Sequence, residues 1–228
     1  LEISVEEKAT GEISAGAGVG TDGTSFMFAV SENNWLGRGI RLNTSAHISE
    51  ETVSGSLSVI NPNYNYSGNS VYSTLDLSST DKTGSSGFES EKTGFSLGTE
   101  FEQYQNIYLS PSISATIEDV EAESTASKQI RDMEGSFTNV DFKYGIAVDK
   151  RDQAFQPTDG YRTNFTQSLP LVMDTSSILN GFDVSTYHSF SEDLIGSAKF
   201  YLRTIHGVND DDVRLSNRLF IPQKRLRG

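Results

Sequence analysis

Apolar and polar residues alternate one by one along many segments of the chain, and this pattern limits the possible folds more than any other feature. Between Ile13 and Val19, for example, every second residue is apolar and the residues between them are Ser or Gly. A period of two residues is typical of a β-strand, and helical spacing of apolar residues fits none of these segments. The sequence therefore predicts an all-β protein.

Eleven segments show the alternation, and most are about as long as the roughly 9–11 residues that a tilted strand needs to cross a membrane. A soluble β-sandwich would use strands of about five or six residues. Thr21-Asp22-Gly23 is expected to be a tight hairpin turn. Connections are expected to be short at one end of the barrel and longer at the other, where the loops include Asp81–Glu89 and Glu121–Gly135. The expected strands are Gly11–Thr21, a strand through Phe26, Phe28 and Val30, Ile40–Ile48, Val53–Val59, Ser70–Ser79, Ser90–Glu102, Ile107–Val120, Phe137–Asp149, Tyr161–Pro170, Ile178–Phe190 and Leu194–His206.

These strands predict an antiparallel, up-and-down transmembrane β-barrel. The sequence has no run approaching the roughly 20 apolar residues of a membrane-spanning helix, so strands are the remaining way to cross a bilayer. Aromatic residues near the expected strand ends, where the membrane interfaces would lie, fit this prediction: Trp35, Tyr64, Tyr66, Tyr104, Tyr108 and Phe155. Bacterial single-chain barrels have an even number of strands, so eleven leads us to expect further strands that this sequence lacks.

Composition argues against nucleic-acid binding and against enzymatic chemistry. The 228 residues carry a net charge of −13, with 18 Lys and Arg against 31 Asp and Glu, whereas binding to phosphates needs a basic surface. Cysteine is absent, which excludes disulfides and thiolate metal sites and fits an oxidising compartment such as the periplasm or the cell surface. No G-x-S-x-G motif is present. The three histidines, His47, His188 and His206, lack the spacing of a metal site, and we expect no metal and no cofactor.

Several turns resemble those of the outer-membrane β-barrel assembly factors of the BamA type, also called the bacterial surface antigen family. Val5–Gly11 resembles the junction between the last periplasmic POTRA repeat and the first barrel strand, and Ser31–Gly39 resembles the first periplasmic turn. Asn61-Pro62 also matches. The most specific of the turns resembles the D-x-R-D…P-T-x-G motif, through Asp149, Arg151, Asp152, Phe155, Pro157 and Gly160.

The last four residues, Arg225, Leu226, Arg227 and Gly228, resemble the start of the family's V/L-R-G-F motif on the long loop after the eleventh strand. In the family this loop folds back into the lumen, so the resemblance implies that Arg227 is a latch that pairs with acidic residues of later strands. The paired glycine that usually precedes the motif is missing, because the sequence there reads Ile221-Pro222-Gln223-Lys224. The local bend of this loop is therefore expected to differ.

The resemblance implies a barrel of sixteen strands, of which this chain carries about eleven. Residues 1–10 would be the end of the last POTRA repeat, and residues 11–228 the N-terminal part of the barrel in the bacterial outer membrane. The implied function is that of the central subunit that folds and inserts other β-barrel proteins. Its partners would be unfolded outer-membrane protein clients, membrane lipid and accessory lipoproteins.

Glycines in the first strand suggest how such a subunit would work. Gly11, Gly16, Gly18 and Gly20 lie within ten residues, and glycine weakens a strand. We expect the pairing between this strand and the last barrel strand, which this sequence lacks, to be a weak lateral seam that opens toward the bilayer and offers a strand edge to clients. The alternative is that small residues only relieve crowding in the lumen. Two other functional classes stay open, a two-partner-secretion-type or porin-like transport barrel and a soluble β-rich adhesin.

Overall fold

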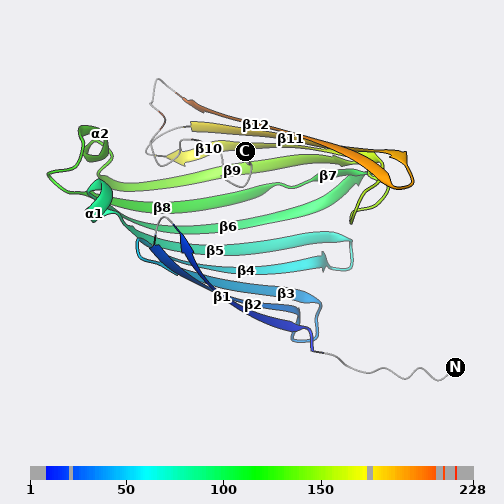
Figure 1. The fold of residues 1–228 in the computed structure, drawn as a ribbon, viewed down its shortest axis with the longest axis horizontal. Helices are drawn as coiled ribbons and strands as arrows, with labels where there is room; N and C mark the ends of the chain where they lie inside the picture. The colour runs from blue at the N-terminus through cyan, green and yellow to red at the C-terminus, as the bar shows by residue number, and fades with distance from the viewer. Residues whose placement is uncertain (1–8, 21–22, 174–176, 209–212, 214–218, 220–228) are drawn as a thin grey trace.

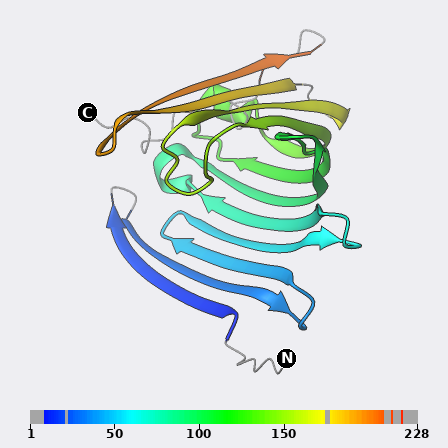
Figure 2. The same ribbon diagram turned by 90° about the vertical axis from the view of Figure 1, so that its right-hand side faces the viewer.

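One antiparallel β-sheet, curved into an incomplete barrel, makes up nearly all of the computed structural model of the protein (Figures 1 and 2). The structure describes residues 9–20, 23–173, 177–208, 213 and 219. A helix with the length and apolarity needed to span a membrane is not found among these residues.

Neighbouring strands in the sequence are also neighbours in the sheet, as in an up-and-down barrel. Two short helices lie in the connections at one end, which we call the helix rim; the opposite end is called the Trp35 rim (Figure 1). In chain order the elements are β1 (Gly11–Gly20), β2 (Gly23–Trp35), β3 (Ile40–Ser49), β4 (Thr52–Tyr64), β5 (Asn69–Asp81), α1 (Thr83–Ser86), β6 (Phe88–Tyr104), β7 (Ile107–Leu109), β8 (Ser112–Ala122), α2 (Lys128–Arg131), β9 (Gly135–Asp149), β10 (Gly160–Met173), β11 (Ser177–Ser191) and β12 (Leu194–Gly207).

The prediction of eleven crossings is confirmed, because β7 and β8 together form a single crossing. They are separated only at Ser110-Pro111, where proline has no N–H to donate to the sheet. Both strands pair with β6 on one side and β9 on the other. The strands extend beyond several predicted ends: β2 continues to Trp35 and β4 to Tyr64, through polar residues that do not continue the apolar alternation.

The two loops predicted at the helix rim contain the short helices α1 and α2, which the sequence pattern does not predict. Each helix has four residues, too few for a periodic pattern to be visible. The side chain of Ser127 caps α2 by accepting a hydrogen bond from the backbone N–H of Ile130. The predicted turn at residues 21–23 lies mostly outside the described residues.

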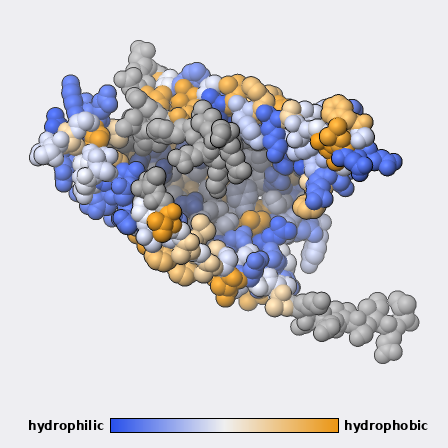
Figure 3. All heavy atoms as spheres, viewed as in Figure 1, coloured by the Kyte–Doolittle hydropathy of each residue, from blue (hydrophilic) through white to orange (hydrophobic). Residues whose placement is uncertain are grey.

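The two faces of the sheet differ in polarity because side chains alternate across each strand. Pairing places Phe28 of β2 opposite Ala15 of β1 and Ala46 of β3, and the same convex face continues through Leu75 and Phe95. Large apolar side chains on this face are exposed, including Ile13, Phe28, Leu77, Phe95, Leu97, Ile113, Ile117, Phe200 and Leu202. Figure 3 shows hydrophobic residues along the margin formed by β1 and β2, and hydrophilic residues around the helices.

The concave face is polar and carries most of the serines of the strands. A row running across the sheet includes Ser45, Ser56 and Asp76 on neighbouring strands, followed by Gly94 and Thr116 on the next two. Among the described residues, only Val120 and Ala126 are buried hydrophobic residues. A soluble protein would bury its apolar face, so the continuous exposed apolar surface fits a sheet that is surrounded by lipid and argues against a soluble adhesin.

Candidate functional site

Strand β1, at one edge of the described sheet, is the first candidate site. Backbone pairing connects β1 to β2 from Gly11 opposite Glu32 to Gly20 opposite Gly23, without a register shift. Among the described residues, no strand pairs with the other edge of β1. All side chains from Gly11 to Val19 are exposed, so the strand is held by its pairing with β2 alone.

The glycines of β1 have free space around them. No described atom lies within 4 Å of a Cβ built on Gly16, and only the Ser25 hydroxyl, at 3.5 Å, lies near one built on Gly18. A Cβ on Gly11 would lie 3.0 Å from a carboxylate oxygen of Glu32. Between residues 11–19 and β2, the described side chains form no hydrogen bond, and the side-chain bond from Thr10 to Glu32 lies beyond the base of the strand.

Strands β9–β12, on the opposite side of the sheet, differ from β1 because side-chain bonds join them on both faces of the sheet. On the convex face, the Tyr144 hydroxyl donates to Gln167 Oε1 (2.7 Å), Gln167 Nε2 donates to Asn180 Oδ1 (2.5 Å), and Asn180 Nδ2 donates to the Thr204 hydroxyl (3.2 Å). We call these four residues the polar ladder. It links β9, β10, β11 and β12, and on the concave face Arg203 and Asp183 form an ion pair at 2.8 Å.

The polar ladder lies within an apolar surface. The neighbouring row of the convex face on one side is Ile146, Phe165, Phe182 and Leu202, and the row on the other side begins with Phe142 and Leu169. Polar side chains facing lipid are costly unless they are hydrogen-bonded, and each ladder residue has a partner within the ladder. No sequence motif marks these four residues. They could have been found only by placing them on the predicted strands and knowing the register between those strands.

The connection between β9 and β10 is the second candidate site, and it lies at the Trp35 rim (Figure 2). Arg151 holds Asp149 through two bonds, from Nε to Oδ1 (2.8 Å) and from Nη2 to Oδ2 (2.7 Å). The Asp152 carboxylate accepts hydrogen bonds from the backbone N–H of Thr158 (3.0 Å), the Thr158 hydroxyl (2.6 Å) and the backbone N–H of Asp159 (3.2 Å). These bonds, the one from the Thr158 hydroxyl above all, hold the pKa of Asp152 below its ordinary value.

Gly160 closes this connection in a conformation that other residues rarely adopt. Its φ is +92°, and a Cβ there would overlap the backbone carbonyl oxygen of Lys150. Pro157 is half-buried and follows Gln156, whose φ is +50°. The five predicted motif residues Asp149, Arg151, Asp152, Pro157 and Gly160 therefore lie in one ordered turn. Besides the bonds within the turn, the Asp159 carboxylate lies 3.7 Å from Nδ1 of His188 on β11.

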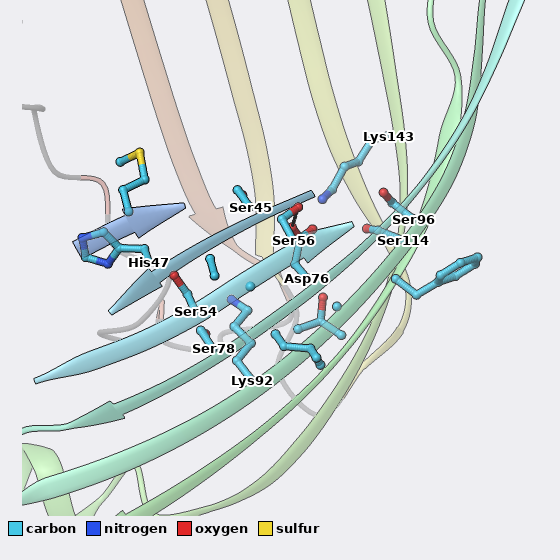
Figure 4. A pocket seen from close by; sticks show the side chains of 17 residues that line it. Ser45, His47, Ser54, Ser56, Asp76, Ser78, Lys92, Ser96, Ser114 and Lys143 are labelled. Atoms are coloured by element: carbon cyan, nitrogen blue, oxygen red, sulfur yellow. Dashed lines mark hydrogen bonds between the residues drawn. The ribbon is translucent and has the colours of Figure 1, made fainter. Parts of the chain in front are cut away.

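A polar pocket lies on the concave face, from β2 to β9 (Figure 4). Its volume is about 460 Å³, and serines, Lys92, Lys143 and Asp76 line it. The Ser56 hydroxyl donates to Asp76 Oδ1 at 2.7 Å. The side chains of the pocket carry charges of both signs, as expected for the wall of a polar lumen.

The expected latch motif and the expected POTRA end cannot be compared with the geometry of the described residues. The latch motif Arg225, Leu226, Arg227 and Gly228 lies outside the described residues, as do residues 1–8 of the expected POTRA end. Among the residues that the structure describes, no cluster of three or more His, Cys, Asp or Glu could hold a metal ion.

Comparison with known proteins gives a family and a fold. The model of the Omp85 superfamily domain matches residues 34–228. The crystal structure of BamA from Haemophilus ducreyi lacking POTRA domains 1–3 is similar in fold, with a TM-score of 0.73 and 19% sequence identity. The match covers 92% of this chain and 44% of that chain, so this chain spans less than half the length of the BamA chain.

Proposed function

The chain belongs to the Omp85 superfamily and is part of a bacterial outer-membrane β-barrel. On this basis, we propose that it serves in the central subunit that folds and inserts other β-barrel proteins. Its clients would be unfolded outer-membrane proteins. Its other partners would be membrane lipid and accessory lipoproteins. In this proposal the Trp35 rim faces the periplasm, since the chain before β1 enters at that rim and resembles the end of a periplasmic repeat. No covalent intermediate and no cofactor take part.

The glycine-rich strand β1, whose residues 11–19 are joined to β2 by backbone pairing without side-chain hydrogen bonds, is the observation that carries this proposal. A client strand that enters lipid must have its backbone N–H and C=O groups paired, because hydrocarbon offers them no partner. An insertase can meet this need by offering a strand edge to which the client adds. β1 is suited to the task because its exposed residues include several glycines, and a glycine-rich strand leaves the sheet more readily than a valine-rich one.

The uneven distribution of side-chain bonds supports a seam at β1. The polar ladder and the Arg203–Asp183 ion pair hold β9–β12 together on both faces. No comparable bond joins the described residues 11–19 of β1 to β2. A sheet built in this way opens first at its β1 side, since separating β1 breaks backbone bonds only.

Other motif residues have structural roles in the proposal. The β9–β10 turn, with Asp149, Arg151, Asp152, Pro157 and Gly160, keeps two long strands in register at the rim. Arg227 acts as the latch of the long loop through charge-assisted hydrogen bonds, which are stronger than neutral ones.

A transport barrel of the two-partner-secretion or porin type is the second candidate, and the polar pocket on the concave face favours it. A lumen lined with hydroxyls and charges of both signs is what a water-filled path requires (Figure 4). The two candidates differ in what they do to a membrane, because an insertase accelerates client folding and a pore conducts ions.

The test measures both properties on the same vesicles, containing the full-length protein with its periplasmic region. We expect folding of an added client barrel to be faster than in vesicles carrying the same mass of an unrelated porin, with small and irregular conductance. A large, steady conductance without faster client folding would refute the insertase and support the transport barrel.

A further inference from the structure

Two connections at the Trp35 rim have the same structure. In β2–β3, Asn34 accepts a bond from the backbone N–H of Gly39 at its Oδ1 (2.6 Å), and in β4–β5 Asn63 does the same for Gly68 (2.8 Å). The backbone N–H three residues after each aromatic residue bonds to its carbonyl, at 3.2 Å from Trp35 and 3.2 Å from Tyr64. Both turns also have two consecutive residues with positive φ, Leu36-Gly37 and Asn65-Tyr66. The shared sequence is Asn, an aromatic residue, three further residues and Gly.

A β-bulge precedes each of these turns and reverses the direction of the aromatic side chain. In β2 the pair Glu32–Leu42 is followed by Trp35–Ile40, so β2 has one residue more than β3. The extra residue shifts Trp35 from the concave to the convex face, because one inserted residue reverses the alternation of a strand.

The same shift occurs in the next two strands that run to this rim. In β4, Asn61–Val71 is followed by Tyr64–Asn69. In β6, Glu102–Tyr108 is followed by Tyr104–Ile107. Without the bulges Tyr64 and Tyr104 would face the lumen; with them they face outward, with exposed fractions of 49% and 69%.

The far side of the rim adds two aromatic residues to the convex face. β11 has a fourth bulge between Ser189 and Ser191. Phe190 stacks edge-on against His188, with ring centroids 5.0 Å apart, and covers Gly196. Tyr161 begins β10 on the same face, opposite Thr186. The rim set is therefore Trp35, Tyr64, Tyr104, Tyr161 and Phe190.

Among the described residues, the helix rim lacks this feature. Of the described Trp and Tyr residues on the convex face, Tyr144 alone lies away from the Trp35 rim, and it belongs to the polar ladder. At the helix rim, the convex face instead places carboxylates opposite each other, Glu91 with Asp119 and Glu89 with Glu121. Bacterial barrels usually have aromatic girdles at both membrane interfaces, whereas the described strands carry aromatic residues at one rim.

We propose that the rim set anchors the barrel in the headgroup region of the phospholipid leaflet on the periplasmic side, and that the bulges exist to direct these side chains outward. Rings with an apolar body and a polar edge are suited to this region, where acyl chains meet hydrated headgroups. The acidic helix rim is unsuited to it. The anchor fixes how deeply the Trp35 rim lies in the membrane. This proposal rests on the proposed function, in which the Trp35 rim faces the periplasm.

Tryptophan fluorescence tests the proposal directly, because Trp35 is the only tryptophan of the chain. The full-length protein, with any tryptophan outside this chain replaced by Phe, is placed in phosphatidylcholine vesicles brominated at shallow or deep acyl positions. We expect stronger quenching of Trp35 by shallow than by deep bromines, and weak quenching by aqueous acrylamide. Strongest quenching by deep bromines, quenching by acrylamide alone, or protection from both would each overturn the proposal; the last would mean that protein covers the rim.

The role of the bulge is tested by deleting Asn33, which removes the extra residue of β2. Trp35 is then expected to turn into the lumen and lose its quenching by bromines while gaining quenching by acrylamide.

A second pair of variants serves if the deletion prevents folding: Tyr104→Trp and Met27→Trp, each combined with Trp35→Phe. Met27 lines the concave pocket. The Tyr104→Trp variant should repeat the shallow quenching and the Met27→Trp variant should not, and equal bromine quenching of the two would refute the proposal. Client insertion is not part of this readout, so failure of the anchor and failure of the insertase are distinguishable.

Discussion

Asp152 orders the β9–β10 turn through hydrogen bonds that depend on its negative charge. Its pKa is lowered, chiefly by the bond from the Thr158 hydroxyl. A carboxyl group whose pKa is lower in the folded state stabilises the fold fully above its unfolded pKa of about 3.9, and this contribution is lost as the pH falls through the folded pKa. We therefore expect Asp152→Asn to lower the stability of the barrel at neutral pH, with a deficit that shrinks as the pH falls below about 4.

The measurement is the urea midpoint of unfolding for both proteins in vesicles, as a function of pH. Asp132→Asn, which removes a charge beside α2, is the matched control and should show no such convergence with the wild type. A deficit of Asp152→Asn that stays constant into acid would show that the carboxylate charge is not what holds the turn. The sequence reveals the charged motif but not its bonds, because Asp152 and Thr158 meet only when the connection folds back on itself.

At the scale of elements, the strands follow from the two-residue period, and the bulges do not. The period predicts eleven crossings because each strand must separate an apolar face from a polar one. It does not show that Trp35, Tyr64 and Tyr104 face outward, since an inserted residue leaves composition unchanged and reverses every later position. The repeated Asn-aromatic turns of β2–β3 and β4–β5 were a signal present in the sequence, and their alignment would have placed both bulges.

The polar ladder makes a prediction about β9–β12. Replacing Gln167 by Leu leaves the Tyr144 hydroxyl and Asn180 Oδ1 without partners in an apolar surface, and each unsatisfied group costs about 1–3 kcal/mol. We expect Gln167→Leu to destabilise the barrel toward urea by about that amount. The quadruple variant that adds Tyr144→Phe, Asn180→Leu and Thr204→Val removes every polar group of the ladder and should recover most of the loss. If Gln167→Leu were as stable as the quadruple variant, the ladder would not hold the strands together.

At the scale of the whole molecule, side-chain bonds join β9–β12, whereas residues 11–19 of β1 are held to β2 by backbone pairing alone, and this asymmetry can be removed experimentally. Gly16→Val with Gly18→Val should fit, because the described residues leave room at both positions. Each glycine in a strand costs about 0.5–1 kcal/mol, so the double variant should be more stable. If β1 must leave its neighbours to template a client, the same double variant should insert client barrels more slowly.

Gly55→Val on β4 is the matched control, since the nearest described atom, the Ser45 carbonyl oxygen, lies 3.8 Å from its Cβ position. It makes the same chemical change far from the seam and should leave insertion unchanged. Equal insertion rates for the β1 variant and the control, measured beside their urea midpoints, would separate stability from function and exclude β1 as the moving edge.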